Sequence, residues 1–340
     1  MQARQNLSLK SFNTFGVAGT AALAWTLETP EQVDPLIEAL EGRTAFILGG
    51  GSNVLFVREL DEPVVLVRLG GRRLLDDDGT TVLLEVGSGE GWDDIVRYTL
   101  SQGWYGLENL SLIPGLAGGA PWQNIGAYGV EVAAFIESVQ AVHTSTGERR
   151  SFSVTDCDFG YRSSFFKSAA GSAWLVTSIR LRLSRKADPR IGYGEIQQEL
   201  FSQGAAASPS PQQVAKAVRS IRRRKLPDPA VVGNAGSFFK NPILRRDAVE
   251  PLLTAFPKLP LYPVPDDSAH MKLPAAWLIE TAGWKGFREG DAGVSANHAL
   301  VLVNHGDATG AELLALAKRI QASVRDRFGI LLEPEPVIVD

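Results

Sequence analysis

A serine hydroxyl in the segment GNAGSFFKNP, residues 233–242, is the first candidate for chemistry in this sequence. Ser237 follows a glycine and precedes two phenylalanines, and the chain contains no G-x-S-x-G nucleophile motif. A hydroxyl without an activating base is a poor nucleophile, but it can donate a proton where an electron-rich group forms beside it. The same pattern also suits an ordinary loop that enters a strand, and this segment alone leaves both interpretations open.

Two further glycine-rich segments have the composition of a cofactor-binding surface. In LGGGSN, glycines at 49–51 precede Ser52-Asn53, and consecutive glycines let main-chain N–H groups converge on a phosphate. A dinucleotide-binding fingerprint needs G-x-G-x-x-G at the start of a helix, whereas this turn leads into the strand-like run Val-Leu-Phe-Val. Residues 108–131 combine five glycines with few charges and with Asn, Gln and Tyr side chains. Together these segments predict a large phosphorylated cofactor.

Composition narrows the class of protein. The chain has 340 residues, of which 44% are hydrophobic and 21% charged, as is typical of a globular protein with more than one domain. The formal net charge of -4 does not favour a nucleic-acid or anionic-membrane partner. No run of about 18 apolar residues could span a membrane, and residues 1–15 lack the apolar core of a signal peptide. We therefore expect a cytoplasmic protein with no nucleic-acid or membrane partner.

The residue inventory gives little support to metal or disulfide chemistry. Cys157 is the single cysteine, so no disulfide can form within the chain and no cage of thiolates can hold a metal. The four histidines show no metal-ligand spacing. We expect no metal site.

Helices that could position the candidate residues are predicted from capping residues and apolar spacing. Thr29-Pro30-Glu31-Gln32 combines an N-cap, a first-turn proline and a capping-box glutamine. Helices over 92–102 and 312–328 end at Gly103 and Gly329, because glycine is the preferred residue after a helix C-terminus.

A fourth helix begins at Ser210-Pro211 and ends in four consecutive basic residues, 222–225. Val214, Ala217 and Ile221 share its apolar face. Basic residues at a helix C-terminus are favoured by the helix dipole and are commonly solvated. They can also bind an anion, and the sequence leaves both interpretations open.

Strand-like runs occupy much of the remaining chain. Residues 44–57 form two apolar runs around the glycine turn, and further β-rich runs cover 63–69, 81–91 and 175–183. Residues 202–213 shift to small residues and proline, which is typical of a linker. We place the main domain boundary there.

The order of these motifs resembles the UDP-N-acetylenolpyruvoylglucosamine reductase family, bacterial flavoenzymes that complete UDP-N-acetylmuramate for peptidoglycan. The resemblance covers nearly the full length, and the insert IGYGEI (191–196) resembles a loop of the type I branch. The segments that carry it are SFNTFGV (11–17), ILGGGSNVLF (47–56), residues 108–131, FGYRSSFFK (159–167), KLPDP (225–229), GNAGSFFKNP (233–242), AAWLIE (275–280) and LEPE (332–335).

The resemblance implies an α+β fold. An FAD-binding fold of the vanillyl-alcohol-oxidase (PCMH) type is expected in two subdomains, at 1–70 and 71–205. A C-terminal α+β substrate-binding domain is expected at 206–330, with the tail at about 331–340 returning near the first subdomain. The family transfers hydride from NADPH, by way of FAD, to the enolpyruvyl double bond of a nucleotide sugar. No His or Cys lies in an FAD-attachment motif, so we expect non-covalent FAD.

The resemblance also assigns roles to single residues. Ser237 matches the proton donor, while Arg162 in FGYRSS and Glu335 in LEPE match groups that stabilise an enolate-like intermediate. Substrate-lining positions fall at Tyr193, Lys225, Asn241, Lys272, Lys285 and His298, the role of His298 being open. FAD-lining positions fall at Gly49, Gly50, Gly51, Ser52, Asn53, Pro114, Gly115, Gly118, Gly119, Gln123, Asn124, Gly126, Ala127 and Tyr128.

These roles agree with elementary chemistry. Hydride addition to an enol ether acrylate moves negative charge into its carboxylate, and a fixed arginine that binds more strongly as this charge develops lowers the barrier. The sequence departs from the family after Glu335, where Pro336 and Val337 replace an apolar residue and an arginine.

Two other functions fit part of the pattern. A flavin oxidase or dehydrogenase with another substrate would share the FAD fold. KLPDP and GNAGSFFKNP argue against this alternative, because in the family that the chain resembles they belong to the substrate domain and not to the FAD-binding part. A non-catalytic nucleotide-sugar-binding protein would not need Ser237, Arg162 and Glu335 together. We therefore expect a monomeric enzyme whose partners are NADPH and a nucleotide-sugar substrate, the preference for NADPH being inherited from the family.

Overall fold

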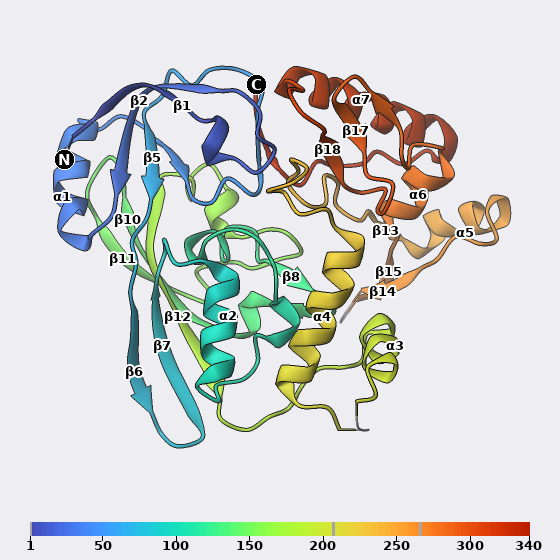
Figure 1. The fold of residues 1–340 in the computed structure, drawn as a ribbon, viewed down its shortest axis with the longest axis horizontal. Helices are drawn as coiled ribbons and strands as arrows, with labels where there is room; N and C mark the ends of the chain where they lie inside the picture. The colour runs from blue at the N-terminus through green and yellow to red at the C-terminus, as the bar shows by residue number, and fades with distance from the viewer. Residues whose placement is uncertain (1, 206–207, 265–266) are drawn as a thin grey trace. The chain divides into compact units, whose positions relative to one another are not determined.

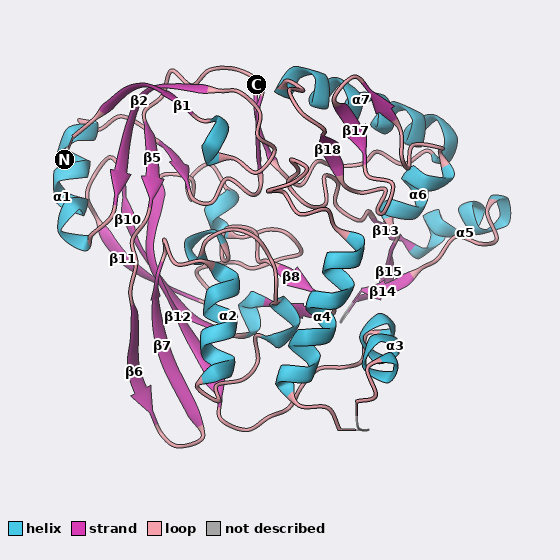
Figure 2. Ribbon diagram, viewed as in Figure 1, coloured by secondary structure: helices cyan, strands magenta, loops and turns pink. Residues whose placement is uncertain are grey.

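The computed structural model describes residues 2–205, 208–264 and 267–340, so Ala206 and Ala207 in the predicted linker lie outside the described residues. Contacts divide the chain into two compact units, each with its own sheets and helices (Figures 1 and 2). Unit 1 comprises Met1–Ser8, Thr20–Gly51 and Glu59–Arg223, and unit 2 comprises Leu9–Gly19, Ser52–Arg58 and Arg224–Asp340.

A four-stranded sheet forms one part of unit 1, in the order β1-β2-β5-β3. Its strands are β1 (Arg4–Ser8), β2 (Thr20–Leu27), β3 (Phe46–Leu48) and β5 (Val64–Val67). β5 is parallel to both of its neighbours and is buried along its whole length, which explains its uninterrupted Val-Val-Leu-Val sequence. Helix α1 (Val33–Leu40) packs Val33, Leu36 and Leu40 into the core beside this sheet.

A five-stranded antiparallel sheet forms the second part of unit 1, in the order β11-β10-β12-β7-β6. Its strands are β6 (Arg72–Asp77), β7 (Thr81–Gly87), β10 (Ile136–His143), β11 (Arg149–Ser153) and β12 (Trp174–Ser184). Helix α2 (Trp92–Ser101) lies against this sheet and buries Trp92, Ile95 and Val96 in the same core (Figure 1). Ala117 and Ala120 also belong to that core, so the second glycine-rich loop is fixed by packing.

Two helices near the end of unit 1 share a smaller core. α3 (Gly194–Ser202) contributes Ile196 and Leu200, and α4 (Pro211–Lys225) contributes Val214, Val218 and Ile221. The short hairpin of β8 (Gly126–Ala127) and β9 (Val130–Glu131) completes the strands of the unit within the described residues. Short 3₁₀ turns lie at Pro30–Gln32, Glu108–Leu110, Ala117–Gly119, Val132–Ala134 and Phe165–Lys167.

Unit 2 contains small sheets and three helices within the described ranges. β4 (Val54–Phe56) pairs in parallel with β19 (Val337–Val339). The other sheets are β13 (Ile243–Arg245), β15 (Asp267–Lys272) and β14 (Tyr262–Val264), and β16 (Arg288–Glu289), β17 (Ala292–Val294) and β18 (Leu302–Asn304). The helices are α5 (Arg246–Ala255), α6 (Ala275–Thr281) and α7 (Gly310–Phe328), with a 3₁₀ turn at Lys10–Phe12. Among the described residues, no helix is both long and apolar enough to cross a membrane.

The predicted helices and strands are confirmed. The capping box of Thr29 and Gln32 is formed, and α1 follows it after one 3₁₀ turn. α7 begins at Gly310, slightly before the predicted start, because Thr309 and Glu312 form its capping box. Gly329 ends α7 with φ 70°, a conformation that glycine adopts without strain. The predicted division into three domains remains a prediction.

Candidate active site

The two glycine-rich segments predicted to bind a cofactor contact each other in unit 1. A Cβ built on Gly50 would lie 2.9 Å from the Cα of Gly115, closer than Cβ atoms come to other atoms in proteins. The approach therefore requires glycine at position 50. The turn at 49–51 and the loop that begins at Gly115 together present a surface of main-chain atoms.

A third glycine-rich segment, GSGEG at 87–91, holds the second loop in place. Gly118 N donates to the carbonyl of Ser88 (2.9 Å), and Ala117 N donates to that of Glu90 (2.8 Å). A Cβ on Gly118 would lie 2.5 Å from the Cβ of Ser88. The sequence analysis included this segment only in the β-rich run 81–91. The regular alternation of glycine with small or polar residues in GSGEG was the feature of the sequence that could have indicated a close approach of another main chain.

An arginine that the sequence analysis did not single out lies beside this surface. The Arg68 guanidinium donates to the carbonyls of Gly49 (3.1 Å) and Val67 (2.6 Å). Burial lowers the pKa of Arg68, and no carboxylate pairs with it within the described residues. A phosphate would give this guanidinium a charge-assisted partner.

These residues fit the diphosphate of FAD. The glycine turn exposes main-chain N–H groups without Cβ atoms, and Arg68 adds a cation next to it. The hydroxyl of Ser88 is buried without a hydrogen-bond partner among the described residues, so the cradle also retains unused hydrogen-bonding capacity. FAD-lining positions at 49–51 and 115–119 are therefore chemically suited to the group.

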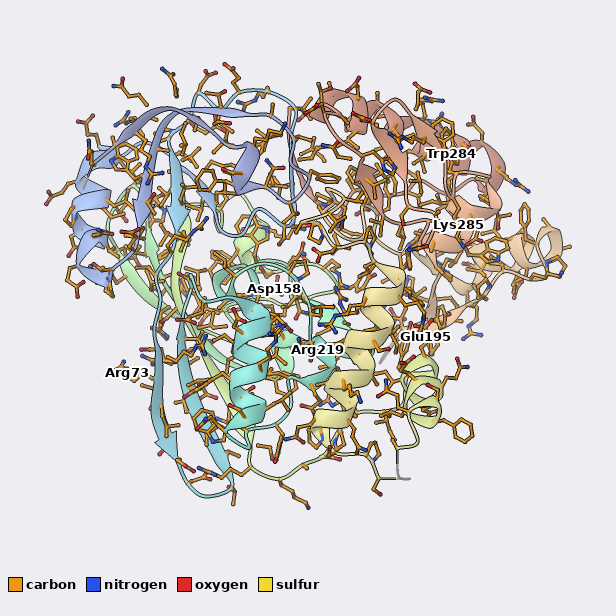
Figure 3. The ribbon with its side chains drawn as sticks, in the orientation of Figure 1. Arg73, Asp158, Glu195, Arg219, Trp284 and Lys285 are labelled. Atoms are coloured by element: carbon orange, nitrogen blue, oxygen red, sulfur yellow. The ribbon has the colours of Figure 1, made fainter. Side chains whose placement is uncertain are left out.

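Substitution of Arg68 by glutamine is expected to weaken FAD binding by about tenfold or more, because a charge-assisted hydrogen bond to phosphate is lost. Flavin fluorescence in an equilibrium titration of apoprotein measures this affinity. Arg73→Gln is the matched control, since Arg73 lies on β6 with 69% of its side chain exposed and pairs with Glu85 (Figure 3). Equal FAD affinity in the two variants would show that Arg68 does not contact the cofactor.

Three non-glycine residues of the predicted site adopt the left-handed region: Asn124 (φ 45°), Tyr128 (φ 51°) and Arg162 (φ 53°). Such strain persists only where surrounding contacts hold it, and it is concentrated at functional sites. The Asn124 amide supplies these contacts by donating to Glu131 (2.8 Å) and to the carbonyl of Gly160 (3.1 Å). The loop at 124–131 is thereby joined to the FGYRSS segment.

Arg162 is fixed against the same loop. Its Nη2 donates to the carbonyl of Gly126 (2.8 Å), and a Cβ on Gly126 would lie 3.2 Å from its Nη1. Tyr128 of this loop makes an edge-to-face contact with Tyr193, the ring centroids being 5.4 Å apart. Unit 1 thus brings the predicted residues Arg162, Tyr128 and Tyr193 to one loop cluster.

In unit 2, the main chain around Phe238 joins three predicted segments. Phe238 N donates to the carbonyl of Leu300 (2.8 Å), two residues after His298. The carbonyl of Phe238 accepts from Glu335 N (2.8 Å). Ser237 therefore lies on a segment flanked by the segments that carry His298 and Glu335. The ring of Phe238 is fully buried and contacts Phe15 and Phe239, which explains the paired phenylalanines.

The loop that presents Ser237 is rigidly held, while its hydroxyl is not used. Asn234 donates to the carbonyls of Pro227 (3.1 Å) and Val232 (2.8 Å), and its own side-chain oxygen accepts from Gly236 N (3.0 Å). Gly236 has φ 70°, which only glycine adopts readily. Within the described part of the chain, no group hydrogen bonds to the half-buried Ser237 hydroxyl. This hydroxyl is available to a ligand.

The tail that carries Glu335 is anchored in spite of the proline that follows. Asn53 Nδ2 donates to the carbonyl of Glu335 (3.4 Å), and Val337 N donates to the carbonyl of Asn53 (3.0 Å). Val337 then begins β19 against β4. The departure from the family at Pro336-Val337 is compatible with this pairing, because the proline nitrogen is not required in the ladder.

The other predicted substrate positions are more dispersed in unit 2. Asn241 is close to the Ser237 segment, and its side-chain oxygen accepts from Ala275 N at the start of α6 (3.0 Å). Lys272 ends β15, and Lys285 pairs with Glu280 after α6 (3.0 Å). Among the described residues, no hydrogen bond or ion pair joins Lys285 to the Ser237 segment. His298 accepts from Leu300 N through Nδ1 (3.3 Å), and Lys225 ends α4.

Comparison with known proteins agrees with this arrangement. The FAD binding domain family matches residues 21–153, and the family described as UDP-N-acetylenolpyruvoylglucosamine reductase, C-terminal domain, matches residues 228–339. The UDP-N-acetylenolpyruvoylglucosamine reductase of Chromobacterium violaceum is 49% identical over 100% of this chain and 99% of the relative. That of Pseudomonas aeruginosa is 47% identical over 99% of this chain and 98% of the relative.

A solved structure shows the same likeness. The crystal structure of UDP-N-acetylenolpyruvylglucosamine reductase from Thermus caldophilus superposes with a TM-score of 0.70, at 26% identity and with 100% of both chains covered. The α+β fold with an FAD-binding part and a C-terminal substrate domain, predicted from the motifs, is thereby confirmed. This chain belongs to the UDP-N-acetylenolpyruvoylglucosamine reductase family.

Proposed function

We propose that this chain reduces the enolpyruvyl group of UDP-N-acetylglucosamine-enolpyruvate to give UDP-N-acetylmuramate, with NADPH as the hydride source. Family membership over the full length supports the substrate and the co-substrate. The observation that carries the mechanism is the hydroxyl of Ser237, which has no hydrogen-bond partner among the described residues and lies in a loop whose main chain is fixed on both sides.

FAD, when bound, supplies the hydride carrier for this reduction. Residues 49–51, the loop 115–119 and Arg68 would hold its diphosphate. Ser237 would hold a proton at Oγ and give it to the carbon beside the substrate carboxylate. No activating base is needed for this role, because the hydroxyl acts as an acid toward an electron-rich carbon.

Two titratable residues of the proposed mechanism act on the carboxylate end of the substrate. Arg162 would bind the carboxylate and bind it more strongly as negative charge develops there. Glu335 would act in its protonated form and stabilise the enolate-like intermediate by donating a hydrogen bond to it. The nucleotide-sugar diphosphate would be held by Tyr193 and Lys225, with Asn241, Lys272, Lys285 and His298 along the remaining substrate surface.

We further propose that the chain acts in the cytoplasm as a monomer. NADPH and nucleotide sugars are cytoplasmic metabolites, so an enzyme that uses both is placed there. Light scattering of the purified protein measures the oligomeric state, and a mass of twice 36.6 kDa would contradict the monomer.

The activity is tested by anaerobic flavin spectroscopy. Purified protein is expected to be yellow, to be bleached by NADPH, and to regain its spectrum when the enolpyruvyl sugar nucleotide is added. Heat denaturation should release the flavin, since it is held non-covalently. Restoration by oxygen but not by the sugar nucleotide would identify a flavin oxidase instead, and colourless protein that cannot be reconstituted with FAD would rule out both enzymes.

A further inference from the structure

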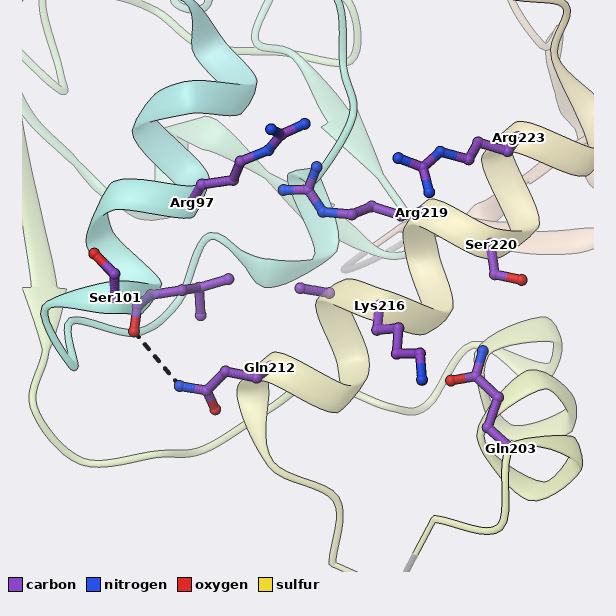
Figure 4. A pocket seen from close by; sticks show the side chains of 10 residues that line it. Arg97, Ser101, Gln203, Gln212, Lys216, Arg219, Ser220 and Arg223 are labelled. Atoms are coloured by element: carbon purple, nitrogen blue, oxygen red, sulfur yellow. Dashed lines mark hydrogen bonds between the residues drawn. The ribbon is translucent and has the colours of Figure 1, made fainter.

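A pocket of about 810 Å³ lies between α2 and α4 in unit 1, apart from the glycine loops (Figure 4). Four of the residues that line it are basic: Arg97, Lys216, Arg219 and Arg223. Lys216, Arg219 and Arg223 stand at positions i, i+3 and i+7 of α4, so they project from one face of that helix. The pocket is large enough for a small organic molecule.

The positive charge of this pocket is only partly neutralised. Asp93 pairs with Arg97 (2.8 Å) and with Arg219 (2.5 Å). Burial opposes its ionisation, but the hydrogen bonds from Arg219 and from the main chain of Leu112 hold the pKa of Asp93 below its usual value. A single carboxylate therefore serves both arginines.

A second carboxylate is bonded to residues that line the pocket. Glu199 of α3 accepts from Ser220 (2.5 Å) and from Gln203 (2.9 Å), both of which line the pocket. Lys216 and Arg223 are exposed, and neither makes an ion pair within the described residues. Among the described residues that line the pocket, four are cationic and none is acidic. The two carboxylates bonded to these lining residues, Asp93 and Glu199, leave an excess of two positive charges.

The geometry of the guanidinium groups favours an oxyanion with several acceptor oxygens. Figure 4 shows the side chains of Arg97, Arg219 and Arg223 directed toward the same gap between the two helices. Arg219 is only 14% exposed, so its fork of donors is held in a fixed direction. Planar guanidinium groups match phosphate oxygens two at a time, and a phosphate offers more acceptors than one carboxylate.

The rest of the lining suits the organic part of such a ligand. Ser101 and Gln212 supply neutral hydrogen-bonding groups at one end, while Leu100 and Ala215 supply apolar contact. We propose that this pocket binds a small organic phosphate, with the phosphate held by Arg97, Arg219 and Arg223 and with Lys216 adding charge. The basic end of α4 is then part of an anion site in addition to being favoured by the helix dipole.

Calorimetric titration of the FAD-loaded full chain with inorganic pyrophosphate tests this assignment. Saturable binding is expected at constant ionic strength, and Lys216→Gln/Arg223→Gln should weaken it at least about tenfold, because two charge-assisted contacts are removed. Both residues are exposed and unpaired in the described chain, so the double variant should keep its melting temperature. Arg223→Lys should retain part of the affinity, since it keeps the charge but not the fork.

Two controls distinguish the pocket from other sources of binding. Arg4→Gln/Lys318→Gln removes the same charge from exposed positions elsewhere and should leave the affinity unchanged. Lys225→Gln removes a charge from the proposed site of the substrate diphosphate, so a loss of pyrophosphate affinity in this variant equal to that in Lys216→Gln/Arg223→Gln would assign the binding to that site instead. Equal weakening in either control, absence of saturable binding, or citrate binding as tight as pyrophosphate would each overturn the proposal.

Discussion

Replacement of Ser237 by alanine is expected to leave NADPH-driven reduction of the bound flavin near the wild-type rate and to slow substrate-driven reoxidation by about 10²–10⁴-fold. The expectation follows from the position of the hydroxyl. It is half-buried, it has no hydrogen-bond partner within the described residues, and its flanking main chain is fixed by Leu300 and Glu335. Loss of its proton affects only the half-reaction in which carbon is protonated.

Stopped-flow absorbance in separate reductive and oxidative half-reactions measures this effect. The substitution should change the melting temperature little, because no hydrogen bond in the described structure is lost. Ser268→Ala, on the exposed side of β15, is the control. Reoxidation of Ser237→Ala by the sugar nucleotide at the wild-type rate would refute the role as proton donor. Equal slowing of both half-reactions would point to a change in the flavin instead.

Much of the local structure could be predicted because its causes lie within a few residues. The capping box of Thr29 and Gln32 and the glycine that ends α7 are local signals, and both are present in the structure. The uninterrupted apolar run of β5 likewise reflects its central position between two parallel neighbours. Such features need no knowledge of distant partners.

Contacts between distant segments could not be predicted in the same way. The approach of Gly50 to Gly115 depends on the packing of two loops, and neither loop contains a sign of the other. The pairing of β4 with β19 joins residues about 280 positions apart, although each strand alone is only three residues long. The resemblance to a family predicted that the C-terminal tail returns near the first subdomain. It did not predict that the tail pairs with β4 as a strand.

The missed elements have physical reasons of the same kind. β6 has the sequence RRLLDD and is largely exposed, so it lacks the alternation that marks a strand and exists because β7 offers it an edge. Arg68 follows a buried strand, and its relation to Gly49 is visible only when β3 and β5 are paired. The i, i+3, i+7 spacing of Lys216, Arg219 and Arg223 indicated a basic face on α4. Nothing in the sequence indicated which residues of α2 lie opposite this face.

Replacement of Arg162 by glutamine is expected to lower the rate of substrate-driven flavin reoxidation by about 10²–10³-fold, which corresponds to the loss of about 3–4 kcal/mol of charge stabilisation. Arg162 is held in the left-handed region at φ 53° and donates to the carbonyl of Gly126 at 2.8 Å. These contacts fix its direction before the substrate arrives, and a preorganised cation stabilises developing charge without reorganisation. Arg162→Lys should recover part of the rate, since charge remains while the fork is lost.

If Arg162 only held the loop in place and did not touch the substrate, its substitution would have a different effect on FAD affinity. Ser164→Ala is the matched control, because Ser164 donates to the carbonyl of Trp122 (2.7 Å) and holds the same segment without a charge. If Arg162 only supports the loop, Arg162→Gln and Ser164→Ala should lose FAD affinity and reoxidation rate together. If Arg162 binds the substrate carboxylate, Arg162→Gln should keep its FAD affinity and lose substrate-driven reoxidation. The rate of reoxidation should fall more than the affinity for substrate, because the carboxylate gains charge in the transition state. An Arg162→Gln enzyme with wild-type reoxidation would therefore exclude the carboxylate-binding role.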